Sequence, residues 1–315
     1  MATKPAFTIA KQLQQLKNRG MLFKDEASAT HFLSTISYYR LQGYWWDMQS
    51  DNVKHVFEPN TYFETVIERY NFDRHLKLIL FDAIERIEIA LRTKMIYHMS
   101  LSYGALWYLD ATLFANPKYH ASSVKIIKKE FDYSKEIFIV DHKRKYPKTN
   151  AESWKTLEVV SMGCLSKLYK NIDHQLPEKT QIAKDMGLHL HNELSSWLEA
   201  IVYVRNIIAH HSRLWSRTMA IKATDTISNP MYDWLNMPLT EVQKKKPFLI
   251  ISTLIYLANA VTPGHQIKDK IIELIKANPN VPIYKLGFLN SWEQNPLWIN
   301  NSSNKGCLSF SIFKK

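Results

Sequence analysis

The 315-residue sequence is poor in glycine and cysteine. It has 8 glycines and 2 cysteines, whereas glycine ordinarily makes up about 7% of residues. The scarcity of glycine disfavours turn-rich β folds and sheets that bind dinucleotides through glycine-dense loops. Cys164 and Cys307 lie far apart and form no C-x-x-C pair. The sequence therefore supports neither a disulfide framework nor a zinc ribbon, and it indicates a reducing compartment.

The sequence also lacks a hydrophobic run long enough to cross a membrane. The longest run, Phe248 to Val261, contains three polar residues and is shorter than the roughly 20 residues that a spanning helix needs. The residues after Met1 contain no apolar signal core. Three lysines precede the run, as in a membrane anchor, but a buried core helix fits this segment better. We expect a cytoplasmic protein with no membrane partner.

Basic residues are in clear excess. The chain has 41 Lys and Arg against 29 Asp and Glu, a formal charge of +12, and 46% of its residues are hydrophobic. Residues 118–155 hold ten basic and five acidic residues. We expect a helix there, followed by a basic loop at 141–150, and we predict that Lys143, Arg144 and Lys145 bind RNA phosphates. A solvated charged surface is the alternative.

Apolar residues recur at helical spacing over most of the chain. Helices are predicted at residues 8–19, 25–36, 61–103, 154–169, 178–186, 190–211, 241–261 and 267–276. Capping boxes predict two of the helix starts, one formed by Thr61 and Glu64 and the other by Thr240 and Gln243. We predict an all-α fold in three parts: an N-terminal helical extension with an aromatic block (1–60), a helical core (61–277) with a basic insertion (118–155), and an irregular C-terminal tail (278–315).

Residues 38–46, YYRLQGYWW, form an unusual aromatic block around Arg40. The block includes Tyr38, Tyr39, Tyr44 and Trp45. Aromatic rings next to an arginine can stack on nucleic-acid bases, so Tyr39 and Arg40 are candidate RNA-binding residues. The alternative is that these rings fill a corner of the core between helices.

The segment 194–211 carries the clearest chemistry. Arg205 falls in line with its apolar stripe, and a guanidinium there is costly unless it is paired or serves a site. Asn206 and His210 are four residues apart and share a helix face, whereas Arg205 and His210 are about 140° apart. These two converge only if the arginine bends round, if the helix ends near Ala209, or if a second chain contributes.

Arginine, an amide and histidine together suit cleavage of RNA without a metal. Histidine can exchange a proton with the ribose 2′-hydroxyl or the leaving 5′-oxygen, and arginine can neutralise charge on the transition state. We predict Arg205, Asn206 and His210 as catalytic residues. His211 is a second candidate base, and Arg213 and Arg217 are candidates for holding phosphate. The spacing of arginine and histidine alone is a weak signal, because two other pairs in the chain match it. No metal or cofactor is predicted.

The string RNIIAHHSRLWSR, residues 205–217, resembles the RNxxAHHxRLWNR signature of Abi-like (abortive infection, AbiD/AbiF) bacterial proteins, members of the HEPN superfamily whose hallmark is RNxxxH. Further blocks are similar to this family: YYRLxGY at 38–44, YxFDR at 70–74, IExxLR at 87–92, WxxxE at 154–158, GxLSxLY at 163–169 and LGF…W…PLW at 286–298. Ser216 departs from the pattern, since asparagine is usual there, as do Ser153 and Leu289, which stand where proline is frequent.

This resemblance implies a HEPN-type helical bundle and a metal-independent endoribonuclease that leaves a 2′,3′-cyclic phosphate. It also implies a composite active site across a homodimer. The expected role is antiphage defence or a toxin-antitoxin system, with a phage-derived trigger and with RNA or protein partners that restrain activity. One alternative is a non-catalytic HEPN protein that holds a structured small non-coding RNA. Another is a protein-interaction sensor that detects a phage component through the aromatic block.

Overall fold

The computed structural model describes residues 5–299, which form twelve α-helices, several 3-10 turns and one small antiparallel sheet. The α-helices are α1 (Ile9–Asn18), α2 (Glu26–Thr35), α3 (Tyr38–Trp45), α4 (Phe63–Tyr103), α5 (Pro117–Tyr133), α6 (Ile137–Lys145), α7 (Ser153–Thr156), α8 (Met162–Asn171), α9 (Pro177–Asp185), α10 (His191–Ala209), α11 (Pro247–Val261) and α12 (Ile267–Ala277). The sheet pairs β1 (Gln49–Asp51) with β2 (Val56–Phe57). The predicted all-α class is confirmed.

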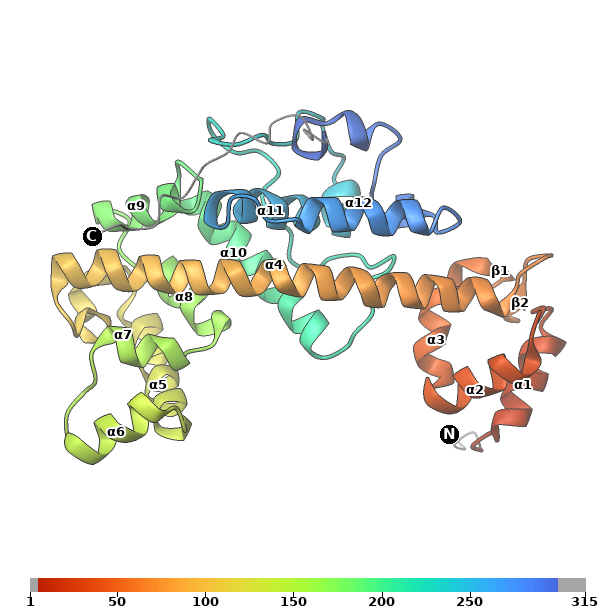
Figure 1. Cartoon of the computed structure of the whole chain (residues 1–315), viewed down its shortest axis with the longest axis horizontal. Coiled ribbons are helices and arrows are strands. Elements are labelled where there is room, and N and C mark those ends of the chain that lie inside the picture. Colours follow the sequence, from red (N-terminus) through yellow and green to blue (C-terminus); the bar gives the residue numbers. More distant parts are fainter. Residues whose placement is uncertain (1–4, 300–315) are drawn as a thin grey trace, which may run out of the picture.

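Helix α4 forms the central axis of the fold. It runs for 41 residues and ends at Gly104, whose positive φ of 82° suits glycine. Helices α1 to α3 and the sheet lie at one end of α4, and α5 to α9 lie at the other (Figure 1). Helices α11 and α12 pack along one side of α4, and α10 crosses it. Segments far apart in the sequence are therefore brought together along one helix.

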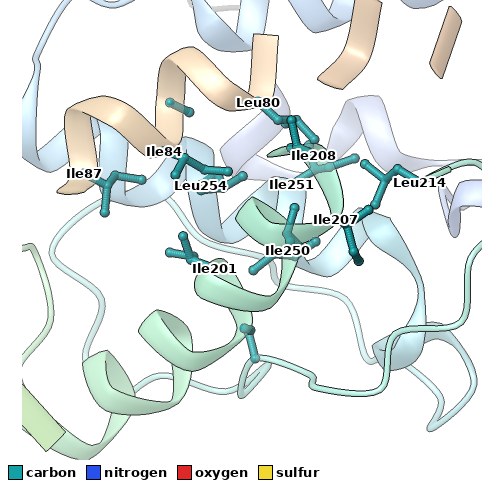
Figure 2. Packing of buried hydrophobic residues seen from close by; sticks show 14 of the residues in the cluster. Leu80, Ile84, Ile87, Ile201, Ile207, Ile208, Leu214, Ile250, Ile251 and Leu254 are labelled. Atoms are coloured by element: carbon teal, nitrogen blue, oxygen red, sulfur yellow. The ribbon is translucent and has the colours of Figure 1, made fainter. Parts of the chain in front are cut away.

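The main core lies where α4, α10 and α11 meet (Figure 2). Ile84 of α4, Ile201 of α10 and Leu254 of α11 are buried in it. The core continues past the end of α10 through Leu214. Every residue of α11 from Pro247 to Ala258 is buried, so the longest hydrophobic run is the core helix that the sequence predicts. Within residues 5–299, no helix is long and apolar enough to span a membrane.

Neither predicted capping box starts the helix expected of it. Helix α4 begins at Phe63 and has no side-chain cap; the Glu64 carboxylate instead accepts hydrogen bonds from the amides of Lys24 (3.0 Å) and Asp25 (3.2 Å). The box of Thr240 and Gln243 does form, with the Gln243 amide 3.3 Å from the Thr240 hydroxyl. It opens only a 3-10 turn, however, and α11 starts afterwards at Pro247.

Two further segments differ from the prediction. The helix expected at 154–169 is divided into α7 and α8 by extended backbone at Val160, and Glu130 holds the Ser161 amide (3.0 Å) next to this break. The basic loop expected at 141–150 is helical up to Lys145, because those residues form the end of α6. The periodicity of apolar residues does not predict the break at Val160 or the helix up to Lys145, since both segments are held by contacts with the neighbouring helix α5.

The C-terminal segment is held to α11 by aromatic side chains. Phe288 and Trp298 lie 4.8 and 5.8 Å from Phe248 of α11, measured between ring centroids. Trp292 packs on both Phe288 and Trp298. The rest of the predicted irregular tail, residues 300–315, lies outside the described residues.

Candidate active site

Helix α10 ends in a Schellman turn that begins at the candidate catalytic histidine. The helix stops at Ala209, and His210 is its C-cap. The amide of His211 donates to the Ile208 carbonyl (2.9 Å), and the amide of Ser212 donates to the Ile207 carbonyl (2.9 Å). His211 has a φ of +54°, a left-handed conformation that glycine usually supplies at this position. The helix end near Ala209 was one of the three conditions that the sequence left open.

Two cations hold the carbonyl groups of this turn. The Arg40 guanidinium of α3 donates to the His211 carbonyl. The Lys77 ammonium of α4 donates to the Ser212 carbonyl at 3.2 Å. Carbonyls that follow a helix end have no partner within the helix, so Arg40 and Lys77 supply the hydrogen bonds that the turn itself lacks.

The carboxylate of Asp73 holds the residues that follow this turn, Leu214 and Trp215, by hydrogen bonds to their backbone amides. Asp73 lies on α4 and is completely buried. It accepts hydrogen bonds from the amides of Trp215 (2.7 Å) and Leu214 (3.3 Å) and from the hydroxyl of Tyr44 (2.7 Å). It also pairs with Lys77 at 3.1 Å. A buried charge is tolerated when it is paired and fully hydrogen-bonded, and here those bonds join α3, α4 and the turn.

Arg213 and Trp215 add two more contacts to this assembly. The Arg213 side chain lies against Gly43 of α3, where an added Cβ atom would come within 2.8 Å of it. The indole of Trp215 packs edge-on to Phe72 and lies under the Arg69 guanidinium, 5.6 Å from the ring centroid. Burial lowers the pKa of the Arg213 guanidinium and raises the pKa of the Tyr44 phenol, which the Asp73 carboxylate raises further.

The predicted catalytic side chains lie at the surface next to this turn. Asn206, His210 and His211 are exposed and Arg205 is half-buried. Within residues 5–299, no hydrogen bond or ion pair engages any of these four side chains, and none joins Arg205 to His210. Glu88 of α4, the acid of the IExxLR block at 87–92, pairs with Arg92 at 2.9 Å. The side chains of Arg205, Asn206, His210 and His211 are therefore not used in hydrogen bonds or ion pairs within the described residues, and they remain available to a ligand.

The basic trio of the insertion is largely engaged in local contacts. The Lys143 ammonium donates to the carbonyls of Phe131 and Asp132, each at 2.8 Å, and so caps the end of α5. Arg144 and Lys145 both pair with Asp141, and these cations lower the pKa of its carboxyl group. The trio lies on α6, at the opposite end of α4 from α3 (Figure 1), so the structure does not bring it to His210.

The family model of the Abi-like proteins matches residues 31–216, more than half of the chain. The chain belongs to the Abi-like protein family. The match ends at Ser216, directly after the two residues, Leu214 and Trp215, whose amides donate to Asp73. No curated protein and no solved structure matches this Abi-like chain. The family connects it to abortive infection, a form of antiphage defence.

The sequence predicted no role for Asp73, Lys77 or Gly43 in this Abi-like protein. The signal that was present is the position of Asp73, which lies in the apolar stripe of α4 together with Leu76 and Leu80. A carboxylate in such a stripe requires a buried partner, but nothing in the local sequence identifies that partner. No group of three or more His, Cys, Asp or Glu side chains in the described part of the chain is arranged to hold a metal ion.

Proposed function

We propose that this protein is a metal-independent endoribonuclease of HEPN type that acts in antiphage defence. The observation that carries the proposal is the turn from His210 to Arg217, which Asp73, Lys77 and Arg40 hold in place and which places two histidines and two arginines beside an arginine and an amide of α10. Catalytic groups need a rigid support to keep a productive geometry. Asp73, Lys77 and Arg40 supply that support, and they use backbone groups of the turn rather than its candidate catalytic side chains.

The reaction is a transesterification within the RNA strand. An imidazole of His210 takes the proton of a ribose 2′-hydroxyl, and the 2′-oxygen attacks the adjacent phosphorus. The bond from phosphorus to the 5′-oxygen breaks, and that oxygen takes up a proton from a protonated imidazole. The products are a 2′,3′-cyclic phosphate and a 5′-hydroxyl end. The Arg205 guanidinium stabilises the charge on the phosphorus oxygens, and Asn206 orients the phosphate or the histidine.

The charges around the turn suit a phosphate substrate. Arg205, Arg213 and Arg217 lie on or next to it, and Arg40 and Lys77 contact its backbone. The carboxylate that holds the turn, Asp73, is buried; it pairs with the Lys77 ammonium and accepts three hydrogen bonds. The surface therefore offers positive charge and hydrogen-bond donors, the features by which proteins bind the phosphates of RNA.

A second copy of the chain is proposed to complete the site. The reaction needs a base and an acid, and one chain presents its exposed imidazoles at a single helix end. Helix α4 offers a surface for the second copy, because large apolar side chains remain exposed along it. They are Leu78, Phe81, Ile89, Tyr97 and Leu101, between 42% and 72% exposed. Leu78 and Phe81 lie within about one turn of Lys77, which donates to the Ser212 carbonyl of the turn, so a second copy that packs on them would lie close to His210.

Helix α5 supports a longer contact with RNA. Lys118, Lys125 and Lys129 are exposed along one face of α5, and no ion pair engages them within the described residues. A row of free ammonium groups can follow a phosphate backbone. This observation also favours the second candidate function, in which the protein holds a structured small RNA without cutting it.

Sequencing the RNA that co-purifies with the wild-type protein and with the His210→Ala variant tests the proposal. An endoribonuclease leaves new 5′-hydroxyl ends at discrete sites in wild-type cells, and these ends disappear in the variant. An RNA-holding protein retains one discrete RNA in both cases and creates no ends. The same comparison for growth, in cells that express each form, should show toxicity only for the wild type.

A further inference from the structure

A pocket of about 510 Å³ lies between α1 and α3. Its lining combines aromatic and polar side chains with the aliphatic Pro5, Ala6 and Leu33, and it contains no acidic residue. The residues that matter here are Tyr38, Tyr39, Gln12, Gln15, Gln42 and Arg19. Aromatic faces, three side-chain amides and a guanidinium are the groups that proteins use to stack on a nucleic-acid base and to hydrogen-bond its edge.

The groups of this pocket retain binding capacity. Tyr39 is 80% exposed and stands edge-on to Tyr38, with ring centroids 6.0 Å apart. The Arg19 guanidinium donates one hydrogen bond to the Tyr38 hydroxyl at 2.8 Å, which positions it beside the rings. The side-chain oxygen of Gln12 is buried and has no hydrogen-bond partner within residues 5–299. The volume is in the range of small-molecule sites.

Helix α3 joins this pocket to the candidate active site. Tyr39 and Gln42 line the pocket, whereas their neighbours Arg40 and Gly43 face the turn, through the His211 carbonyl and the Arg213 side chain. Tyr39 and Gly43 are one helical turn apart and share a face, so the two surfaces adjoin each other along α3, and a helix with its side chains is about 10 Å wide. A strand whose phosphate lies at His210 can therefore place a neighbouring nucleotide in the pocket.

We infer that the pocket between α1 and α3 binds one unpaired nucleotide of the RNA substrate and sets the sequence preference of cleavage. This inference rests on the proposed function. Stacking on Tyr39 holds the base, and the amides of Gln42 and Gln15 distinguish bases by their edges. The ligand chemistry is that of a nucleobase with its phosphate, which both an RNA strand and a free nucleotide supply.

A cleavage experiment on a pool of random RNA sequences tests the preference. Tyr39→Ala and Gln42→Leu remove the stacking face and one amide, and the rate ratio between favoured and disfavoured sequences should fall about tenfold at one position next to the cut. Tyr284→Ala and Gln14→Leu are matched controls, because these exposed side chains do not line the pocket. An unchanged preference in the pocket variants overturns the inference.

A binding experiment keeps the inference separate from the proposed function. His210→Ala protein is titrated with trinucleotide RNAs and with free nucleoside monophosphates, with and without Tyr39→Ala. Tighter binding of the trinucleotide, weakened about tenfold by Tyr39→Ala, supports the pocket even if the wild type cleaves no RNA. Equal or tighter binding of the monophosphates overturns the assignment to an RNA strand. Binding that Tyr39→Ala does not weaken overturns the site.

Discussion

The Asp73 carboxylate accepts the backbone amide of Trp215 at 2.7 Å, across 142 positions of sequence. This bond joins the central helix α4 to the segment that follows the candidate catalytic histidine. Tyr44 of α3 donates to the same carboxylate, so three blocks of the family pattern meet at one buried group. The aromatic block (38–46), the YxFDR block (70–74) and the segment after His210 are therefore joined to one another through the Asp73 carboxylate.

Removing the Asp73 charge should loosen the turn. Asp73→Asn places an amide NH₂ group among backbone donors and removes the partner of Lys77, so we expect a loss of about 3 kcal/mol in the free energy of unfolding. Tyr44→Phe removes one hydrogen bond and should cost about 1 kcal/mol. Urea unfolding measures both. If neither variant lowers the free energy of unfolding measurably, the Asp73 carboxylate does not hold the turn.

Two helical glycines should respond differently to alanine. A Cβ atom at Gly43 would lie 2.8 Å from the Arg213 side chain, whereas one at Gly163 would lie 3.7 Å from Val202, an ordinary contact. Gly163→Ala should therefore be neutral or stabilise the protein by up to about 1 kcal/mol, because alanine favours helix. Gly43→Ala should displace Arg213 and weaken RNA binding. Unfolding and RNA-binding titrations of the two variants check this contrast, and identical behaviour contradicts it.

Glycine should be well accepted at position 211. The left-handed backbone of His211 strains an ordinary residue, so His211→Gly should leave stability unchanged or raise it by up to about 1 kcal/mol, and His211→Ala should not gain this. If His210 is the principal acid–base group, His211→Gly should reduce cleavage by much less than the roughly 100-fold expected for loss of a general acid or base. Calorimetry of His211→Gly measures the effect of the backbone conformation on stability, and its cleavage rate measures the contribution of the imidazole. A cleavage rate reduced 100-fold or more would assign the principal acid–base role to His211.

Lys179 should make stability depend on pH under alkaline conditions. It is buried on α9, where its ammonium donates to the carbonyls of Lys170 (2.9 Å) and Ile172. Burial lowers its pKa from 10.5 to about 8. Between these values the unfolded chain binds more protons than the folded one, so the contribution of Lys179 to stability rises with pH, by at most about 3 kcal/mol. The unfolding free energy of the wild type minus that of Lys179→Met should rise with pH across this range; parallel curves would refute the shift.

Local sequence patterns predicted the elements whose formation depends on nearby residues. The apolar stripe of α10, the buried helix α11 and the stop of α4 at Gly104 all follow from spacing, hydrophobicity and backbone preference. The sequence placed the end of α10 at His211 and left an end near Ala209 as one of three possibilities. The candidate residues Arg205 and His210 were likewise visible as an arginine and a histidine on one helix.

Contacts between distant segments could not be predicted in this way. Glu64 holds the start of α2 instead of capping its own helix, and Lys143 caps α5. The hydrogen-bond partner of each of these side chains depends on which chain segment lies nearby in space, because a carboxylate or an ammonium can bond to several kinds of partner. The support of the turn by Asp73 has the same origin, since the two amides that it accepts there, those of Leu214 and Trp215, follow more than 100 positions later.

The most direct test of the central claim is cleavage of an RNA oligonucleotide in the presence of EDTA, with product ends identified by mass spectrometry. The account predicts that the wild type cuts the RNA and leaves a 2′,3′-cyclic phosphate, and that a 2′-deoxy substitution at the cut position blocks the reaction. Arg205→Ala and His210→Ala should abolish cleavage, whereas His174→Ala, at an exposed histidine, should retain it. Cleavage that requires Mg²⁺, leaves a 3′-hydroxyl, or persists in His210→Ala would contradict the account.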